Sequence, residues 1–240
     1  MSIKRDKWMQ YRILKGTSSL AARLPETRLL KLNELAKQLH QYQSLVLKPR
    51  AGSFGRDILF ITRDGANSYH IHSERKTVTM KDTERLLQWI GKETGNRGYV
   101  VQRRLQLAQI QHSPFDIRIM VQRRKGNAST WNVTGSYAKV AAKGYLITNV
   151  PSRIIPVPEA LKLARLRDRS LIVKANRIAL LAAQRLGGRF PKLRQVGFDI
   201  GIDRNRRIWI IEGNYQPDLQ PFRLLKDSSM YHKIRWYQKH

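Results

Sequence analysis

The chain has 240 residues, with 46 Lys and Arg against 17 Asp and Glu, no Cys, and a formal net charge of +29. A hydrophobic content of 41% excludes general disorder, and the lack of cysteine excludes disulfides and thiolate metal sites. The N-terminus has no signal-peptide core and no apolar run approaches a membrane span, so we expect a cytoplasmic protein that attracts polyanions.

The first half of the chain predicts two helices and a set of short strands. A helix is expected over 27–42, with Thr27 as its N-cap and leucines at helical spacing. Strands are expected at 44–48 and 57–62 and in the runs SYHIHS and KTVTM. The second helix, 81–95, ends at a glycine C-cap.

The second half predicts hairpins around one long helical region. Strands are expected in YVVQRRLQL, FDIRIMVQRR, STWNVTGSYAKVAA and YLITNV. Residues 158–187 are expected to be helical with a break near Arg167–Asp168, followed by a final hairpin that turns at DRNR. The order lacks a βαβ rhythm, so it predicts an α+β fold with mostly antiparallel sheets.

The final hairpin places scarce acidic residues inside apolar strands. Strand alternation puts Glu212 and Asn214 on one face, and a turn at 203–206 brings Asp199 opposite them. Three oxygen-bearing side chains on one face suit a hard cation such as Mg²⁺. The alternative is that each acid pairs with one of the many Arg or Lys residues, which also lowers the free-energy cost of burying it.

Two further motifs point to phosphate binding, and each has a simpler alternative. In FDIRIMV, Arg118 either holds a phosphate through its planar guanidinium or pairs with Asp116 on the same strand face. In LVLKPRAGSFGRDI, Lys48 ends a strand before a turn whose Gly52 and Gly55 allow backbone amides to wrap an anion. The alternative there is an ordinary β-turn.

These stretches, taken in order, resemble the ATP-grasp superfamily and most closely its YheC/YheD-like, endospore coat-associated branch. The resemblance is carried by LPETRLL, LVLKPRAGSFGRDI, YVVQRRLQL, SPFDIRIMVQ, WNVTGSYAKVA, TNV and GFDIGIDRNRRIWIIEGN. It covers about residues 10–225. It implies an ATP-grasp fold in which two antiparallel-sheet lobes clasp a nucleotide.

The resemblance also implies a role for each matching residue. Lys48 contacts the α- and β-phosphates, Arg118 steadies the γ-phosphate, and both are the expected catalytic residues. Glu212 bridges one or two Mg²⁺ ions. The remaining implied ligands are Gly52, Ser53, Phe54 and Gly55 in the phosphate loop, Gln102, Arg103 and Leu105 in the adenine hinge, and Asp199 and Asn214 at the metal.

On the acceptor side the chain departs from the family pattern. Lys139 stands where Arg is usual, and Asn149 is followed by VPSRIIPVP, which includes Arg153, where related proteins carry a Gly-Gly pair. The expected domains are a basic segment (1–26), a first lobe (27–98), a second lobe (99–226) and a basic aromatic tail (227–240).

Two functions follow as expectations. The first is an ATP-dependent carboxylate–amine ligase that works through an acylphosphate in spore-coat or envelope assembly. The second is a catalytically weak or inactive ATP-grasp scaffold that binds polyanions, either nucleic acid, an anionic envelope polymer or an acidic coat protein. The net charge of +29 motivates the second expectation.

Overall fold

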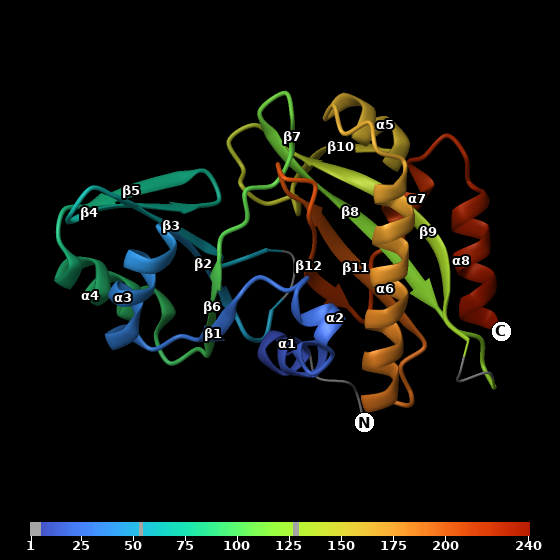
Figure 1. Cartoon of the computed structure of the whole chain (residues 1–240), viewed down its shortest axis with the longest axis horizontal. Helices are drawn as coiled ribbons and strands as arrows, with labels where there is room; N and C mark the ends of the chain where they lie inside the picture. The colour runs from blue at the N-terminus through green and yellow to red at the C-terminus, as the bar shows by residue number, and fades with distance from the viewer. Residues whose placement is uncertain (1–5, 53–54, 127–129) are drawn as a thin grey trace. The chain divides into compact units, whose positions relative to one another are not determined.

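The computed structural model describes residues 6–52, 55–126 and 130–240 (Figure 1). Contacts divide these residues into two compact units. The smaller unit contains 6–9 and 25–105, and the larger unit contains 10–24 and 106–240. The division after Leu105, and not near 98, reflects strand pairing within the smaller unit, because its sheet includes residues 99–103.

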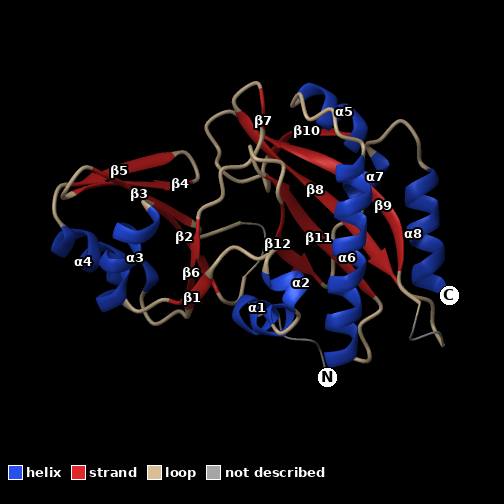
Figure 2. Cartoon of the chain, viewed as in Figure 1, coloured by secondary structure: helices blue, strands red, loops and turns tan. Residues whose placement is uncertain are grey.

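The smaller unit is an antiparallel sheet packed against two helices (Figure 2). The sheet has the strand order β1-β6-β2-β3-β4-β5. Its core consists mainly of leucines and isoleucines from both helices and from the strands, together with Tyr69, Tyr99 and Val101. The elements are β1 (Thr27–Leu29), α3 (Leu32–Tyr42), β2 (Ser44–Pro49), β3 (Leu59–Asp64), β4 (Ser68–Ser73), β5 (Lys76–Met80), α4 (Thr83–Thr94) and β6 (Tyr99–Arg103).

The prediction for the start of this unit was partly wrong. Thr27 does not cap a helix; it lies in β1 opposite Gln102 of β6, and the helix begins only at Leu32. The hydroxyl of Thr27 donates to the Pro25 carbonyl and accepts from the Gln102 amide. Tertiary strand pairing therefore outweighs a local capping signal. The helix predicted to end at Gly95 is confirmed.

The larger unit is a second antiparallel sheet with the order β10-β9-β8-β11-β12, to which β7 adds by pairing with β8. Its strands are β7 (Gln109–Ile110), β8 (Ser113–Gln122), β9 (Asn132–Ala141), β10 (Pro151–Ile155), β11 (Gln195–Ile202) and β12 (Ile208–Asn214). Its helices are α2 (Ser18–Ala21), α5 (Val157–Leu163), α6 (Ser170–Arg189), α7 (Gln220–Arg223) and α8 (Ser229–Lys239). The division between the units falls within α1 (Lys7–Lys15).

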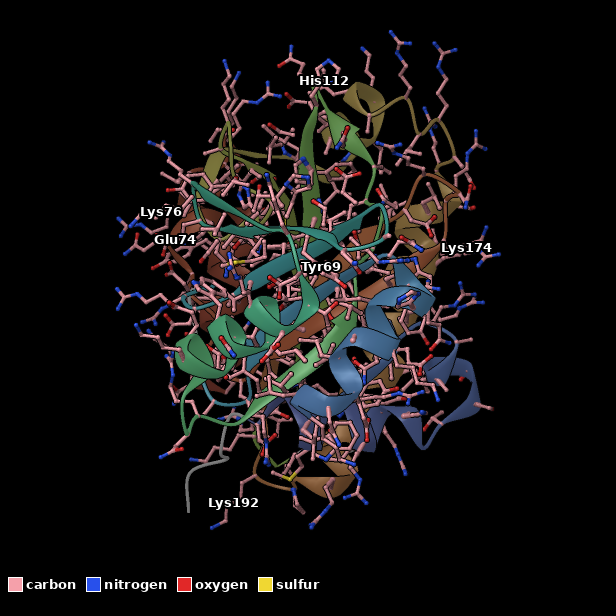
Figure 3. All side chains as sticks on the ribbon, turned by 90° about the vertical axis from the view of Figure 1, so that its left-hand side faces the viewer. Tyr69, Glu74, Lys76, His112, Lys174 and Lys192 are labelled. Carbon is pink, nitrogen blue, oxygen red and sulfur yellow. The ribbon has the colours of Figure 1, made fainter. Side chains whose placement is uncertain are left out.

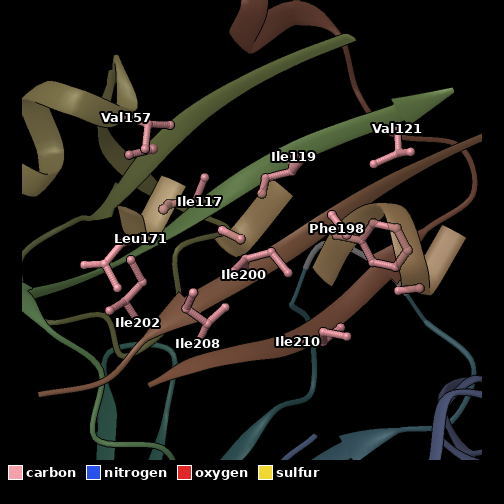
Figure 4. Packing of buried hydrophobic residues seen from close by; sticks show 14 of the residues in the cluster. Ile117, Ile119, Val121, Val157, Leu171, Phe198, Ile200, Ile202, Ile208 and Ile210 are labelled. Atoms are coloured by element: carbon pink, nitrogen blue, oxygen red, sulfur yellow. The ribbon is translucent and has the colours of Figure 1, made fainter. Parts of the chain in front are cut away.

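The two faces of this sheet have different coverings. Ile117, Ile119, Phe198 and Ile200 point toward α6 and form the largest core (Figure 4). On the opposite face, Met120 packs in a smaller cluster with residues of α7 and α8. Side chains alternate between the faces along each strand. The rest of this opposite face carries the polar residues discussed below.

Two expectations for the larger unit have different outcomes. The helical break is confirmed, since α5 and α6 are separate and Arg165 between them has a φ of +57°. The strand predicted at 145–150 is wrong, because the strand that pairs with β9 is Pro151–Ile155. Gly144 has a φ of +85°, and the chain reverses there before it can pair.

No helix in the described part of the chain is long and apolar enough to cross a membrane.

Candidate functional site

Lys48 is a buried lysine at the end of β2, with a relative exposure of 8%. Its ammonium donates a hydrogen bond of 2.7 Å to the Gln102 side-chain carbonyl. The Gln102 amide in turn donates to the Thr27 hydroxyl at 2.9 Å. Burying an ammonium group costs free energy unless acceptors replace water. Lys48 is thus built into the fold and is not one of the many solvated basic residues.

The loop after Lys48 has the strained backbone of a tight turn. Gly52 and Gly55 have φ values of +152° and +67°, and Asp57 has one of +59°. Two ion pairs hold the loop in the smaller unit: Arg50 with Asp6 at 2.5 Å and Arg97 with Asp57 at 2.6 Å. The loop residues Ser53 and Phe54 lie outside the described residues.

A depression of about 800 Å³ lies beside this loop, within the smaller unit. Three guanidinium groups and two carboxylates line it, so its charged lining is net positive. Arg56 is exposed and forms no ion pair with any described residue. The lining residues are Asp6, Pro49, Arg50, Ala51, Gly52, Arg56, Asp57, Arg97 and Gly98.

The predicted hinge residues lie at the end of β6. Gln102 and Arg103 are the last residues of the strand, and Leu105 closes the smaller unit. The Gln102 side chain is held by Lys48 and Thr27, and the Arg103 backbone amide donates to the Glu26 carbonyl at 2.9 Å. Their role in adenine binding stays a prediction.

In the larger unit, strand register gathers polar side chains on the sheet face opposite α6. Asp199 of β11 pairs with Arg118 of β8 on one side and with Glu212 of β12 on the other. Asn214 pairs with Gly197, two residues before Asp199. Directly paired residues share a face, so the three oxygen-bearing side chains lie together.

A register shift in β12 makes this arrangement possible. Ile200 pairs with Ile210, but the preceding Asp199 pairs with Glu212, so Ile211 is an extra residue in β12. Strict alternation from Ile208 and Ile210 would have turned Glu212 toward the apolar core. The bulge moves it to the polar face.

Asp199 is held by two cations. Arg118 donates to both of its oxygens, at 2.8 Å to Oδ1 and 3.1 Å to Oδ2, and Lys139 donates to Oδ1 at 3.0 Å. Burial raises the pKa of Asp199, but the charges of Arg118 and Lys139 outweigh it and hold the pKa at about 2. All three side chains are at most 10% exposed.

Asp116 is the second buried acid of this cluster, and its state differs. The Lys139 ammonium lies 3.3 Å from Oδ1, and the Thr148 hydroxyl donates to Oδ2. Burial raises the pKa of Asp116 to about 6, because the opposing charge of Lys139 does not fully offset it. Asp116 and Asp199 together balance Arg118 and Lys139, so the cluster is neutral when both acids are ionised.

These contacts show how the buried charges of the larger unit are paired. Arg118 pairs with Asp199, which lies 81 residues away, and not with Asp116 on its own strand. Asp199 is therefore ion-paired in this structure, and its role as a ligand of Mg²⁺ stays a prediction. Lys139 of the expected acceptor side belongs to the cluster, whereas Asn149 and Arg153 are exposed.

Sequence reasoning missed two residues that support this face. Thr148 had no signal beyond its place before Asn149. Gln10 of α1 brackets Gly213, accepting from its backbone amide and donating to its carbonyl, both at 2.8 Å. A Cβ at Gly213 would lie 3.0 Å from the Gln10 Nε2, so glycine here leaves room for the bracket.

The donor chemistry of the face fits a hard cation. Asp199, Glu212 and Asn214 supply only oxygen donors that suit Mg²⁺, and Asp199 Oδ2 accepts a single hydrogen bond, from Arg118. No group of three His, Cys, Asp or Glu in the described part of the chain is arranged to hold a metal alone.

A family model for YheC/D-like ATP-grasp proteins matches residues 3–237. The chain belongs to this family. Two relatives from Bacillus subtilis (strain 168) are similar to it: the endospore coat-associated protein YheD, 27% identical over 224 residues, and YheC, 24% identical over 225. Each alignment covers 88% of this chain. The chain spans about half of the first relative (48%) and 60% of the second.

Solved structures show that this fold is the ATP-grasp fold. A biotin carboxylase–β-γ-ATP complex from Campylobacter jejuni matches with a TM-score of 0.59 and 13% sequence identity. The match covers 99% of this chain and 46% of that one. The α+β class with two antiparallel sheets is confirmed.

Proposed function

We propose that this ATP-grasp chain binds Mg-ATP and is an ATP-dependent carboxylate–amine ligase. The observation that carries the proposal is the buried Lys48, held by Gln102 at the start of a glycine-containing loop whose surroundings are net positive. The Lys48 ammonium is already held in place, so binding a phosphate does not require the protein to reorganise around it. Family membership supports the same conclusion.

The proposed reaction has two steps. A carboxylate oxygen of the first substrate attacks the γ-phosphorus, the bond from that phosphorus to the β,γ-bridging oxygen breaks, and ADP leaves. The nitrogen of an amine then attacks the acylphosphate carbon, inorganic phosphate leaves, and the amine gives up a proton. Phosphoryl transfer of this kind depends on positioning and charge neutralisation more than on covalent help from the protein.

Each proposed residue has a limited task in these steps. Lys48 neutralises the α- and β-phosphates, with Gly52, Ser53, Phe54 and Gly55 as the loop that covers them. Gln102, Arg103 and Leu105 bind adenine. Arg118 orients the γ-phosphate, and Lys139, Asn149 and Arg153 lie on the acceptor side.

Arg118 can orient a phosphate only while its own position is fixed. Its bidentate pair with Asp199 fixes the plane of the guanidinium, and Gly197 allows the Arg118 side chain to pack closely, since a Cβ there would lie 3.1 Å from Arg118 Cδ. Asp199, Glu212 and Asn214 would hold Mg²⁺, which when bound neutralises charge on the phosphates.

The experiment that tests the proposal is thermal unfolding with ATP, with and without Mg²⁺. A ligand at 100 times its Kd stabilises the folded protein by about 2.7 kcal/mol. We expect a Mg²⁺-dependent rise in Tm that Lys48→Met and Glu212→Gln abolish and that the exposed-residue control Lys37→Met retains. Because Lys48 is buried, the partly exposed Glu212 provides a second variant that disturbs the packing less.

A nucleotide response that is absent in the wild-type chain, or unchanged in both site variants, refutes the site. Where ATP stabilises the protein, ADP release is then measured against panels of carboxylic acids and amines. Release only in the presence of an acid supports the ligase. Binding without release, for any acid and amine pair, leaves an ATP-binding protein and refutes the ligase.

The place of action that we propose is the assembly of the spore coat or cell envelope. It is supported by the endospore coat-associated relatives, of which this chain spans about half to three fifths. Association of a tagged chain with purified spore coats tests this part. Recovery only in the soluble fraction of sporulating cells contradicts it.

The second candidate function is an ATP-grasp scaffold that binds polyanions without chemistry. The excess of 29 positive charges favours it, because a nucleotide site requires far fewer. The two candidates differ in the response to Lys48→Met, which removes nucleotide binding but leaves polyanion binding intact. Under this candidate the partner is an acidic coat protein or an envelope polymer.

A further inference from the structure

The larger unit carries a dense basic segment at and around α6. Among residues 162–192 a single acid, Asp168, accompanies nine exposed basic residues. Six of the nine are arginines. We call this set the basic ridge: Lys162, Arg165, Arg167, Arg169, Lys174, Arg177, Arg185, Arg189 and Lys192.

Helix geometry aligns the central part of the basic ridge. α6 is 20 residues long and contains no Asp or Glu. At 100° per residue, Lys174, Arg177 and Arg185 fall within about 80° of arc, and Arg189 widens the arc to about 120° and extends the row to about 22 Å along the axis. The buried alanines of α6 pack on the sheet core. The basic row is the solvent side of a helix whose inner side is fixed.

The charges of the basic ridge are largely unpaired. Among the described residues, Arg177, Arg189 and Lys192 form no ion pair, and Lys174 lies 3.9 Å from Asp168. Arg185 donates a hydrogen bond to the Ile13 carbonyl at 3.2 Å, and this neutral acceptor leaves its positive charge unneutralised. Figure 3 shows Lys174 and Lys192 pointing away from the ribbon. Unpaired cations in a row concentrate the positive potential.

The turn between β11 and β12 adds to the same region. Arg204, Arg206 and Arg207 are exposed there. Hydrogen bonds from Ser170 lower the pKa of Asp168, and the charges of Lys174 and Arg206 lower it further. These three exposed arginines add further positive charge to the larger unit outside α6.

The composition of the basic ridge selects among anionic partners. Arginine forms bidentate hydrogen bonds with phosphate oxygens. The segment offers no exposed aromatic ring for stacking on an unpaired base, because its single aromatic residue, Phe190, packs against Tyr215. Cations carried on a helix that is fixed by packing match a regular row of phosphates without ordering a flexible backbone.

We propose that the basic ridge binds the phosphate backbone of double-helical nucleic acid without reading its sequence. Binding of this kind releases condensed counterions, so its affinity falls steeply with salt. The surface lies within the larger unit and uses none of the residues proposed to contact ATP. It is independent of the proposed ligase activity.

The test is fluorescence anisotropy of a labelled DNA duplex of about 20 base pairs, titrated at several salt concentrations. The ridge variant is Lys174→Glu/Arg177→Glu/Arg189→Glu. The matched control is Lys37→Glu/Lys81→Glu/Lys92→Glu, three exposed lysines of the smaller unit that form no ion pair with a described residue. Both variants lose six charge units, so a difference between them reports position and not net charge.

We expect the ridge variant to bind at least about tenfold more weakly at 0.1 M salt, and its slope of log K against log salt to be smaller by about 3. The control should keep most of the affinity and slope, as should Lys48→Met. Arg177→Lys/Arg189→Lys, which keeps the charge, should lose less than the ridge variant. A retained Tm shows that each variant is folded.

Three results overturn the proposal. The first is equal weakening in the ridge and control variants, which would leave only non-specific net charge. The second is equal or tighter binding of the single strand of the same length, which would indicate base stacking elsewhere. The third is equal competition by poly-glutamate of matched charge, which would indicate a polycarboxylate partner.

Discussion

Lys139 is expected to be indispensable to the larger unit because it serves two buried acids at once. Its ammonium lies 3.0 Å from an oxygen of Asp199 and 3.3 Å from one of Asp116. Lys139→Met keeps the length of the side chain and removes the charge. Removing one partner of a buried ion pair costs about 3–5 kcal/mol, and we expect a loss of this size in the free energy of unfolding at pH 8.

The pH dependence separates electrostatics from packing. The pKa of Asp116 is about 6 in the folded protein and 3.8 in a model compound, so the folded state binds this proton more tightly than the unfolded state. The contribution of Asp116 to the free energy of unfolding is therefore greatest below pH 3.8, and it is lost as the pH rises through 6. At 1.36 kcal/mol per pH unit, ionised Asp116 costs the fold about 3 kcal/mol.

Without Lys139 the pKa of Asp116 rises further, so the variant loses more stability than the wild type between pH 5 and pH 8. We expect the difference in unfolding free energy to be clearly smaller at pH 5, where Asp116 is mostly protonated in both proteins. The assay is urea denaturation at the two pH values. Adding Asp116→Asn to the variant should recover more than half of the loss at pH 8.

The control is Lys143→Met, an exposed lysine beyond the end of β9, which should change stability by less than about 0.5 kcal/mol. A loss from Lys139→Met below about 1 kcal/mol at pH 8 would refute the reasoning. An equal loss at pH 5 and pH 8 would refute the role of Asp116 and leave packing or the lost ion pair with Asp199, which is ionised at both pH values, as the cause.

Three smaller predictions concern the backbone of the larger unit. Gly197→Ala should cost about 1–3 kcal/mol in urea denaturation, because the new Cβ would lie 2.7 Å from Pro217 Cβ; an unchanged midpoint would contradict this. A Cβ added at Gly188 of α6 would have no neighbouring atom within 4 Å, so Gly188→Ala should raise the free energy of unfolding by about 0.5–1 kcal/mol. A lower Tm would be inconsistent with this prediction. Asp203→Ala removes two backbone hydrogen bonds and the 2.8 Å bond from Trp209, and should cost about 2–4 kcal/mol with a change in tryptophan fluorescence. A loss below about 1 kcal/mol would show that solvent replaces these bonds.

Much of the architecture followed from local patterns. The α+β class, the antiparallel pairing, the final hairpin and the helix ending at Gly95 were all predictable, because hydrophobic periodicity and turn residues act over a few positions. The burial of Lys48 could not be predicted from the local sequence pattern. Its ammonium donates to Gln102 because β6 pairs beside β2, and Gln102 lies 54 residues further along the chain.

The sequence alone determined which side chains were available on the polar face, and tertiary structure decided how they are paired. Asp199, Glu212 and Arg118 stand in strands that alternation identifies. The extra residue Ile211, which turns Glu212 away from the apolar core, has no signature in the sequence run itself.

The partner of Arg118 likewise depends on strand order. Arg118 meets Asp199 because β8 lies beside β11, and Lys139 reaches both acids because β9 lies on the other side of β8. A local pattern fixes the face on which a charge lies, because side-chain direction repeats every two residues. Its partner is fixed by the register between distant strands, which results from packing the whole sheet against α6.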